Sequence, residues 1–179
     1  ADLYLNARQY LQASRHLTRV AEITVSQGDA EEAMRIYRRI LDFMPKSTAP
    51  RERLLELYRQ AGARAEVLSL TQELLSHYEL DGNLAKTISC LEQLVNLDPT
   101  NESYAWKLAT LLKTSGFREK ALKVYSQLGQ QLQKAQKWPA TIKCFEEWHA
   151  LEPGNRDVTL QLAGLYEKNG QPHKAMELL

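Results

Sequence analysis

This chain of 179 residues has few cysteines, few helix-breaking residues and no long apolar run. Two cysteines are too few for a disulfide framework. No stretch approaches the roughly 18 apolar residues that a membrane span needs, and the first residues show no signal-peptide pattern. The formal net charge of +1 gives no overall attraction to nucleic acid or to an anionic membrane. Composition therefore points away from disulfide-rich, membrane-spanning and strongly basic protein classes.

The usual side-chain groupings of enzymes and metal sites are also missing from the sequence. There is no Ser-His-Asp set, no paired-carboxylate pocket and no phosphate-cradling glycine loop. The four histidines fall at positions without the spacing of a metal-ligand motif: His16, His77, His149 and His173. The sequence thus predicts no catalytic, cofactor-binding or metal-binding residues.

What the sequence does contain is an internal repeat with a period of 54 residues. Pro45, Pro99 and Pro153 are spaced by this period, and so are three glycines and three leucines. The further equivalent positions are Gly62, Gly116 and Gly170; Leu54, Leu108 and Leu162; Thr87 and Thr141; Cys90 and Cys144. Self-similarity at a fixed period of this size is typical of stacked helical repeats. We expect one repeat domain over 1–179, with partial repeats 1–45 and 154–179 around full repeats 46–99 and 100–153.

Each full repeat reads as three helices. In the first helix Leu54, Leu57, Tyr58 and Ala61 form one apolar stripe, Ser47 or Thr48 can cap its start, and Gly62 ends it. The predicted helices span 50–61, 64–80, 83–97, 102–115, 118–134 and 138–151. Gly82, the stretch 135–137 and the prolines at the repeat ends separate them.

The ends of the chain fall inside repeats. Tyr4 occupies the position equivalent to Tyr58, so we expect the chain to start near the end of a first helix. Leu179 then lies within a second helix. Because the terminal repeats of such arrays normally carry polar caps, we interpret the chain as a portion of a longer array.

Several short motifs resemble the tetratricopeptide repeat (TPR) family, whose helical hairpins recur every 34 residues. The clearest motif runs from Gly28 through Ala33 to Tyr37, Ile40 and Pro45. Others comprise Leu108, Ala109, Gly116, Ala121, Tyr125 and Leu128; Gly82, Thr87, Leu91, Leu94 and Pro99; and Gln136, Thr141, Phe145, Trp148 and Pro153. The period of 54 fits this family if hairpins 48–81 and 68–101 overlap and share the helix at 64–80.

The resemblance implies an all-α fold, a right-handed α-solenoid of about ten TPR-like antiparallel helices. It also implies a protein-protein interaction or assembly scaffold that binds a peptide or partner protein in a concave groove. The residues at the family's groove positions are Glu52, Glu56, Arg59, Gln60, Trp106, Thr110, Lys113, Thr114, Leu160, Glu167 and Lys168. They contain no asparagine, so we do not expect the family's two-carboxylate clamp for chaperone tails.

The tryptophans, cysteines and charges allow further interpretation. Trp148 aligns with core positions and Trp138 with a helix start, whereas Trp106 either contacts a partner in the groove or covers a contact between helices. Cys90 and Cys144 align with an isoleucine, which indicates apolar packing. Residues 100–137 carry seven basic against two acidic residues, and 65–99 carry one against six. These blocks indicate attraction between neighbouring helices, or a basic strip that receives an acidic peptide.

Two other functions stay open alongside the scaffold. The chain could be a regulatory or substrate-docking arm of a larger enzyme. A helical-repeat nucleic-acid binder is less expected, because no aromatic residues interleave with the basic ones.

Overall fold

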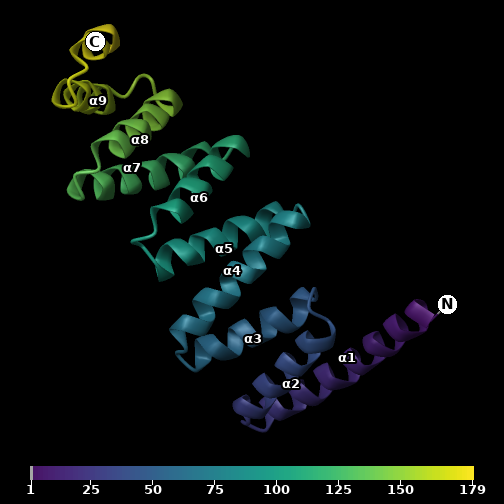
Figure 1. The fold of residues 1–179 in the computed structure, drawn as a ribbon. Coiled ribbons are helices and arrows are strands. Elements are labelled where there is room, and N and C mark those ends of the chain that lie inside the picture. The colour runs from purple at the N-terminus through teal and green to yellow at the C-terminus, as the bar shows by residue number, and fades with distance from the viewer. Residues whose placement is uncertain (1) are drawn as a thin grey trace. The chain divides into compact units, whose positions relative to one another are not determined.

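The computed structural model describes the backbone of residues 2–179 and the side chains of residues 9–179. Over this part of the chain, all regular secondary structure is α-helical, in ten helices (Figure 1). They are α1 (Asp2–Ser26), α2 (Ala30–Phe43), α3 (Thr48–Gln60), α4 (Arg64–Leu80), α5 (Leu84–Leu97), α6 (Glu102–Thr114), α7 (Arg118–Lys134), α8 (Trp138–Leu151), α9 (Arg156–Lys168) and α10 (Pro172–Leu178). The helices form two compact units, unit 1 over Ala1–Leu97 and unit 2 over Asp98–Leu179. The predicted all-α fold of about ten helices is confirmed.

The helix boundaries repeat with the period read from the sequence. Moving α3 forward by 54 residues gives the bounds of α6, and moving it again gives α9. In the same way α4 maps onto α7, and α2 maps onto α5 and then α8. The six predicted helices match the observed bounds within two residues. Each repeat is therefore a triplet of helices, as expected.

Capping residues and left-handed turns set these boundaries. Asn101 accepts a hydrogen bond from the backbone of Ser103 at the start of α6, whereas Ser47 gives α3 no side-chain cap, contrary to the prediction. Gln136 has a φ of 56°, although the two equivalent positions, 28 and 82, hold glycine. A left-handed backbone is unfavourable for residues with a Cβ atom, so Gln136 carries strain that the glycines avoid.

Helix α1 differs from the sequence-based expectation. It is continuous from Asp2 to Ser26, so the predicted break between a first and a second helix near its start is absent. The reason is visible in the sequence, because Arg8 stands where Gly62, Gly116 and Gly170 end the other first helices. Tyr4, on which the expectation rested, lies outside the residues whose side chains are described.

The core of unit 1 lies between consecutive helices. Helix α3 buries Leu54, Leu55, Leu57 and Tyr58, while Ala61, which the predicted stripe included, is exposed at the end of the helix. Helix α4 contributes buried apolar side chains from both of its sides: Val67, Leu70, Leu74, Leu75 and Tyr78. Burial of these side chains provides the main stabilisation of the stacked helices.

The core of unit 2 contains larger and smaller side chains in alternation. Phe145 of α8 is buried and lies against Gly129 of α7, where a Cβ atom would come within 2.9 Å of the Phe145 ring. Trp148 packs on Phe145 with ring centroids 5.4 Å apart but is only half-buried, so its expected core position is partly correct. Cys144 is buried at the same contact, in agreement with its predicted packing role.

The same residue positions link successive triplets in each unit. In unit 1 Arg38 of α2 donates hydrogen bonds to the Tyr58 hydroxyl of α3, with Nε 2.9 Å from the oxygen. In unit 2 the Tyr166 hydroxyl of α9 donates to Glu146 of α8 at 2.6 Å. Arg38 and Glu146 are equivalent by the repeat, and so are Tyr58 and Tyr166. The tyrosine thus serves either as acceptor or as donor at the joint between triplets.

Candidate functional site in unit 1

The candidate site is centred on the solvent side of α3. Leu54, Leu57 and the other apolar residues of this helix point into unit 1. Of the predicted groove residues, Glu56, Arg59 and Gln60 are exposed and Glu52 is half-buried. Two pockets flank this side of α3, and each contains two of these four residues.

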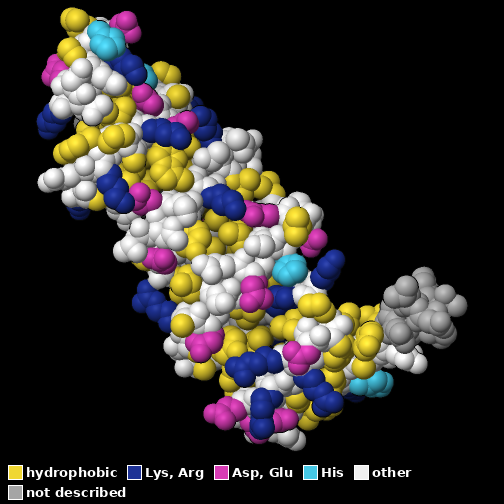
Figure 2. Space-filling view, viewed as in Figure 1, with side chains coloured by type: hydrophobic (Ala, Val, Ile, Leu, Met, Phe, Trp, Pro, Cys, Tyr) yellow, Lys and Arg dark blue, Asp and Glu magenta, His cyan; other side chains and the backbone are white. Residues whose placement is uncertain are grey.

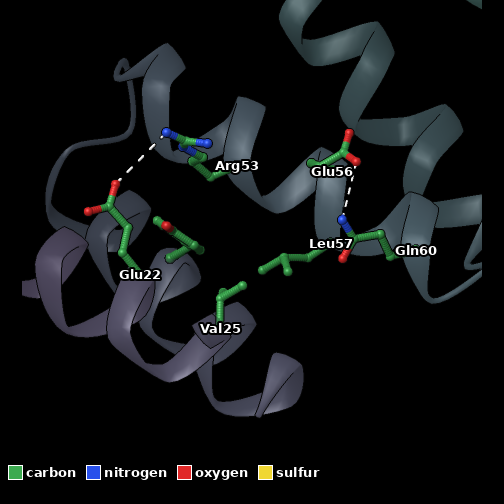
Figure 3. Close-up of a pocket in the computed structure, with 7 residues that line it drawn as sticks. Glu22, Val25, Arg53, Glu56, Leu57 and Gln60 are labelled. Atoms are coloured by element: carbon green, nitrogen blue, oxygen red, sulfur yellow. Dashed lines mark hydrogen bonds and ion pairs between the residues drawn. The ribbon is translucent and has the colours of Figure 1, made fainter. Parts of the chain in front are cut away.

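The first pocket lies between α1, α2 and α3 and has a volume of about 310 Å³ (Figure 3). Its lining consists of Glu22, Val25, Tyr37, Arg53, Glu56, Leu57 and Gln60. Arg53 forms an ion pair with Glu22 across the pocket at 3.9 Å, and Gln60 donates a hydrogen bond to Glu56 at 3.3 Å (Figure 3). Val25 and Leu57 supply the apolar part of the lining. The first pocket thus combines apolar walls with a few polar groups.

Tyr37 at the first pocket keeps its hydroxyl proton. Burial raises the pKa of Tyr37, the nearby carboxylate of Glu22 raises it further, and Arg53 opposes both. A neutral phenol can donate one hydrogen bond and accept others. The first pocket therefore offers carboxylates, a guanidinium, an amide and a phenol to a bound group.

The second pocket lies on the other side of α3, next to α4 and α5, and has a volume of about 250 Å³. Its lining consists of Glu52, Leu55, Arg59, Leu74, Tyr78, Lys86, Ser89, Cys90 and Gln93. Lys86 of α5 donates a hydrogen bond to Glu52 at 2.5 Å, and the hydroxyl of Tyr78 also donates to Glu52. Arg59 donates to Gln93. These bonds connect α3 with α5 although the two helices are 34 residues apart.

The carboxyl of Glu52 is held in its ionised form. Burial raises its pKa, but the hydrogen bonds from Lys86 and Tyr78 outweigh burial and lower the pKa below its ordinary value. Lys86 also lies over the ring of Tyr78, with its Nζ 4.9 Å from the ring centroid. The second pocket therefore holds a fixed acid between a cation and an aromatic ring.

In unit 2 the equivalent helix α6 carries four of the predicted groove residues. Lys113 forms an ion pair with Glu147 of α8 at 2.5 Å, and this hydrogen bond raises the pKa of Lys113. Lys113 and Glu147 occupy the repeat positions of Arg59 and Gln93, so one cross-helix bridge recurs in both units. Thr110 and Thr114 are exposed.

Trp106 of α6 is half-buried between two neighbours. Its ring meets that of Tyr125 edge-on, with centroids 5.9 Å apart, and Lys143 lies over it at 5.3 Å. Trp106 thus packs against both α7 and α8 while keeping part of its surface in solvent.

The predicted groove residues of α9 are all exposed. Leu160 has 49% of its surface in solvent, and Glu167 and Lys168 lie near the end of the helix. On its other side α9 packs into a core cluster with α8 and α10 that includes Val158, Leu162 and Phe145. The structure therefore places these three residues on the outward side of unit 2.

Sequence reasoning missed Glu22, Tyr37 and Arg53 of the first pocket and Lys86 and Gln93 of the second. A signal for the second pocket was present, because Glu52 and Lys86, and Arg59 and Gln93, are each separated by the 34 residues of a TPR hairpin. For the first pocket no comparable spacing existed, since its partners come from the atypical helix α1.

The chemistry of these pockets is that of non-covalent recognition. Burial raises the pKa of the Cys90 thiol to about 11 and that of Cys144 to about 12, so neither is a ready nucleophile. Among the residues whose side chains are described, no group of three His, Cys, Asp or Glu is arranged to hold a metal ion. Within the same part of the chain, no helix has the length and apolarity needed to cross a membrane.

Comparison with known proteins gives matches among solved structures only. No family model and no curated protein matches the chain. A Podosopora anserina putative kinesin light chain with TPR-like repeats is 19% identical, over 92% of this chain and 90% of that one, with a TM-score of 0.37. A tetratricopeptide repeat protein from Parabacteroides merdae is 15% identical, over 93% and 77%, with a TM-score of 0.33. YrrB, described as a TPR protein with an unusual peptide-binding site, is 13% identical, over 94% and 88%, with a TM-score of 0.33. The chain is thus similar to proteins built from TPR or TPR-like repeats.

Proposed function

We propose that this chain is a non-catalytic interaction scaffold whose α3 face binds a peptide or a segment of a partner protein. The observation that carries the proposal is the pair of pockets on either side of α3, each lined by two of the predicted groove residues. Concave sites with apolar walls and a few placed polar groups are the usual form of binding sites. Because packed helices hold both pockets, binding requires little ordering of the receptor.

The charges of the two pockets suggest the polarity of the bound segment. The first pocket contains two carboxylates, Glu22 and Glu56, against one guanidinium. The second contains two cations, Arg59 and Lys86, against the carboxylate of Glu52. A segment that crosses α3 would therefore place a basic or amide side chain in the first pocket and an acidic one in the second.

A selection from a displayed peptide library against the purified chain tests this proposal. Selected peptides should bind the wild type and lose at least about tenfold in affinity for the double variant Glu56→Ala, Gln60→Ala. Both residues are exposed, so the variant should keep the wild-type melting midpoint. The matched control is Glu66→Ala, Ser69→Ala on the exposed side of α4. Equal binding to the wild type and the α3 variant would refute the site.

The groove residues of unit 2 enter the proposal as a second contact area, considered separately from α3. Thr110 and Thr114 are exposed beside the half-buried Trp106, and a tryptophan with partial exposure is a common energetic centre of an interface. Trp106→Ala should weaken partner binding, and a Thr110→Ala variant should do so to a smaller extent. Loss of binding by Trp106→Ala together with unfolding would instead identify Trp106 as a packing residue.

A further inference from the structure

One side of α1 is exposed although the same side is buried in the other copies of this helix. Val20 has 49% of its surface in solvent, whereas the equivalent Leu74 and Leu128 each have 1%. Ala13 is likewise exposed, whereas its equivalents Val67 and Ala121 are buried, and Ile23 is 50% exposed. In Figure 2 hydrophobic side chains gather over the α1 end of unit 1. This side of α1 is therefore an apolar stripe open to solvent.

In unit 1 the equivalent side of α4 is covered by α3. Glu73 of α4 accepts a hydrogen bond from Arg51 of α3 at 3.0 Å, and Tyr78 donates one to Glu52 of α3. Leu74 lies between these two bonding positions on the same helix side. The stripe on α1 thus has the residue positions on which a helix of the α3 kind packs.

Helix α3 itself does not cover the stripe on α1. Glu22 and Val25 line the pocket shared with α3 (Figure 3). At 100° per residue, Val20 and Ile23 lie on a different side of the helix from these two. The open stripe is therefore separate from the α3 face proposed above as a binding site.

The charges beside the stripe define what could cover it. On α4 the acidic Glu73 meets the buried guanidinium of Arg51. On α1 the equivalent of Glu73 is Arg19, and Arg15 lies one turn earlier. Both arginines are exposed, and neither has an ion pair with the residues whose side chains are described. A covering helix would therefore need an acidic residue where α3 has Arg51.

No corresponding helix of this chain meets that requirement. At the position of Arg51, α6 has Ala105 and α9 has Thr159. A second copy of the chain would therefore place a cation or an uncharged residue next to Arg19. Since Arg19 would lose hydration without gaining an acid, these helices are poor occupants.

We propose that the side of α1 formed by Ala13, His16, Arg19, Val20 and Ile23 docks an amphipathic helix of another protein. That helix carries an acidic residue at the place of Arg51 and apolar residues three and four positions later, as Leu54 and Leu55 follow Arg51. This surface adds a second binding site to the scaffold and does not depend on the α3 face.

Two stapled helical peptides copied from residues 46–62 test the proposal, one with the native Arg51 and one with Arg51→Glu. Fluorescence anisotropy should show the Arg51→Glu peptide binding the wild-type chain about tenfold more tightly. The variant Arg19→Glu should reverse this preference, and Val20→Asp should abolish binding of both peptides. No binding of either peptide up to about 1 mM, or binding that Val20→Asp leaves unchanged, would overturn the proposal.

Two controls keep the result interpretable. Val20 is half exposed, so Val20→Asp should keep the wild-type helical signal, and Ala13→Asp serves in its place if it does not. The double variant Glu56→Ala, Gln60→Ala should still bind the Arg51→Glu peptide, which separates this site from the α3 face. Sedimentation velocity should show a monomer. Self-association that Val20→Asp removes would mean that a second copy covers the stripe, and would overturn the proposed partner.

Discussion

Replacement of Gly129 by alanine tests how closely α7 and α8 pack. An added Cβ atom would lie 2.9 Å from Cε2 and 3.3 Å from Cδ2 of Phe145, and 3.6 Å from the sulfur of Cys144. The first distance is too short for carbon atoms, so the phenyl ring or the helix would have to move. Overpacking of this kind costs about 1–3 kcal/mol, while alanine in place of a mid-helix glycine returns about 0.5–1 kcal/mol. We expect Gly129→Ala to lower the free energy of unfolding by about 0–2 kcal/mol.

Gly164 provides a matched control for this change. It also lies in the interior of a helix, α9, but a Cβ atom there would meet no atom within 4 Å. Gly164→Ala should therefore stabilise the chain by about 0.5–1 kcal/mol. Urea denaturation followed by circular dichroism should separate the two variants by about 1–3 kcal/mol. Equal stabilisation by both alanines would show that the contact between Gly129 and Phe145 is not tight.

The repeat also suggests how the Gly129→Ala defect can be relieved. In unit 1 the positions of Gly129 and Phe145 hold Leu75 and Leu91, and at α1 and α2 they hold Ala21 and Tyr37. A small residue on one helix thus accompanies an aromatic ring on the next, and two leucines replace the combination. Phe145→Leu in the Gly129→Ala background should recover at least about 0.5 kcal/mol relative to the sum of the single changes. Strict additivity would contradict this account of the core.

Four further predictions concern other parts of the chain. Gln136→Gly should stabilise by about 1 kcal/mol in urea denaturation, because it removes a Cβ atom from a left-handed turn. Ala121→Leu should lower the free energy of unfolding by about 1–3 kcal/mol, because Ala121 has no exposed surface; an unchanged urea midpoint would count against the helix register. The Cys144 thiol should react with a disulfide reagent at pH 8 only on unfolding, because burial raises its pKa to about 12. The lowered pKa of Glu52 means that its bond to Lys86 stabilises the fold above the ordinary carboxyl pKa and is lost as pH falls through the lowered value. The difference in urea midpoint between wild type and Glu52→Gln should therefore disappear in acid.

The sequence predicted the helices well because their ends depend on local chemistry. Gly62 and Gly116 end helices through left-handed turns, and the prolines fall between helices, so spacing alone placed the boundaries within two residues. The prediction failed at α1 for the same local reason. Arg8 replaces the glycine that would have ended a helix there.

The candidate site could be predicted only in part. Family positions identified the exposed residues of α3, because exposure follows from the helical period. They did not identify Arg53 and Glu22, whose 3.9 Å ion pair depends on how α1 lies against α3. Nor could they show that Glu52 is tied to Lys86 and Tyr78. Side-chain partners between helices depend on packing, which spacing within a single helix does not describe.

The exact 54-residue offset between helix boundaries has a consequence for recombination. A segment such as 100–153 begins and ends in turns at equivalent positions, so its removal or duplication leaves every other residue in its original register. Repeat arrays gain stability from contacts between neighbours, so an added triplet brings its own contacts rather than disturbing distant ones. Array length in such a chain can therefore change in whole triplets through unequal crossing-over, without the frameshift in packing that an insertion causes in most domains.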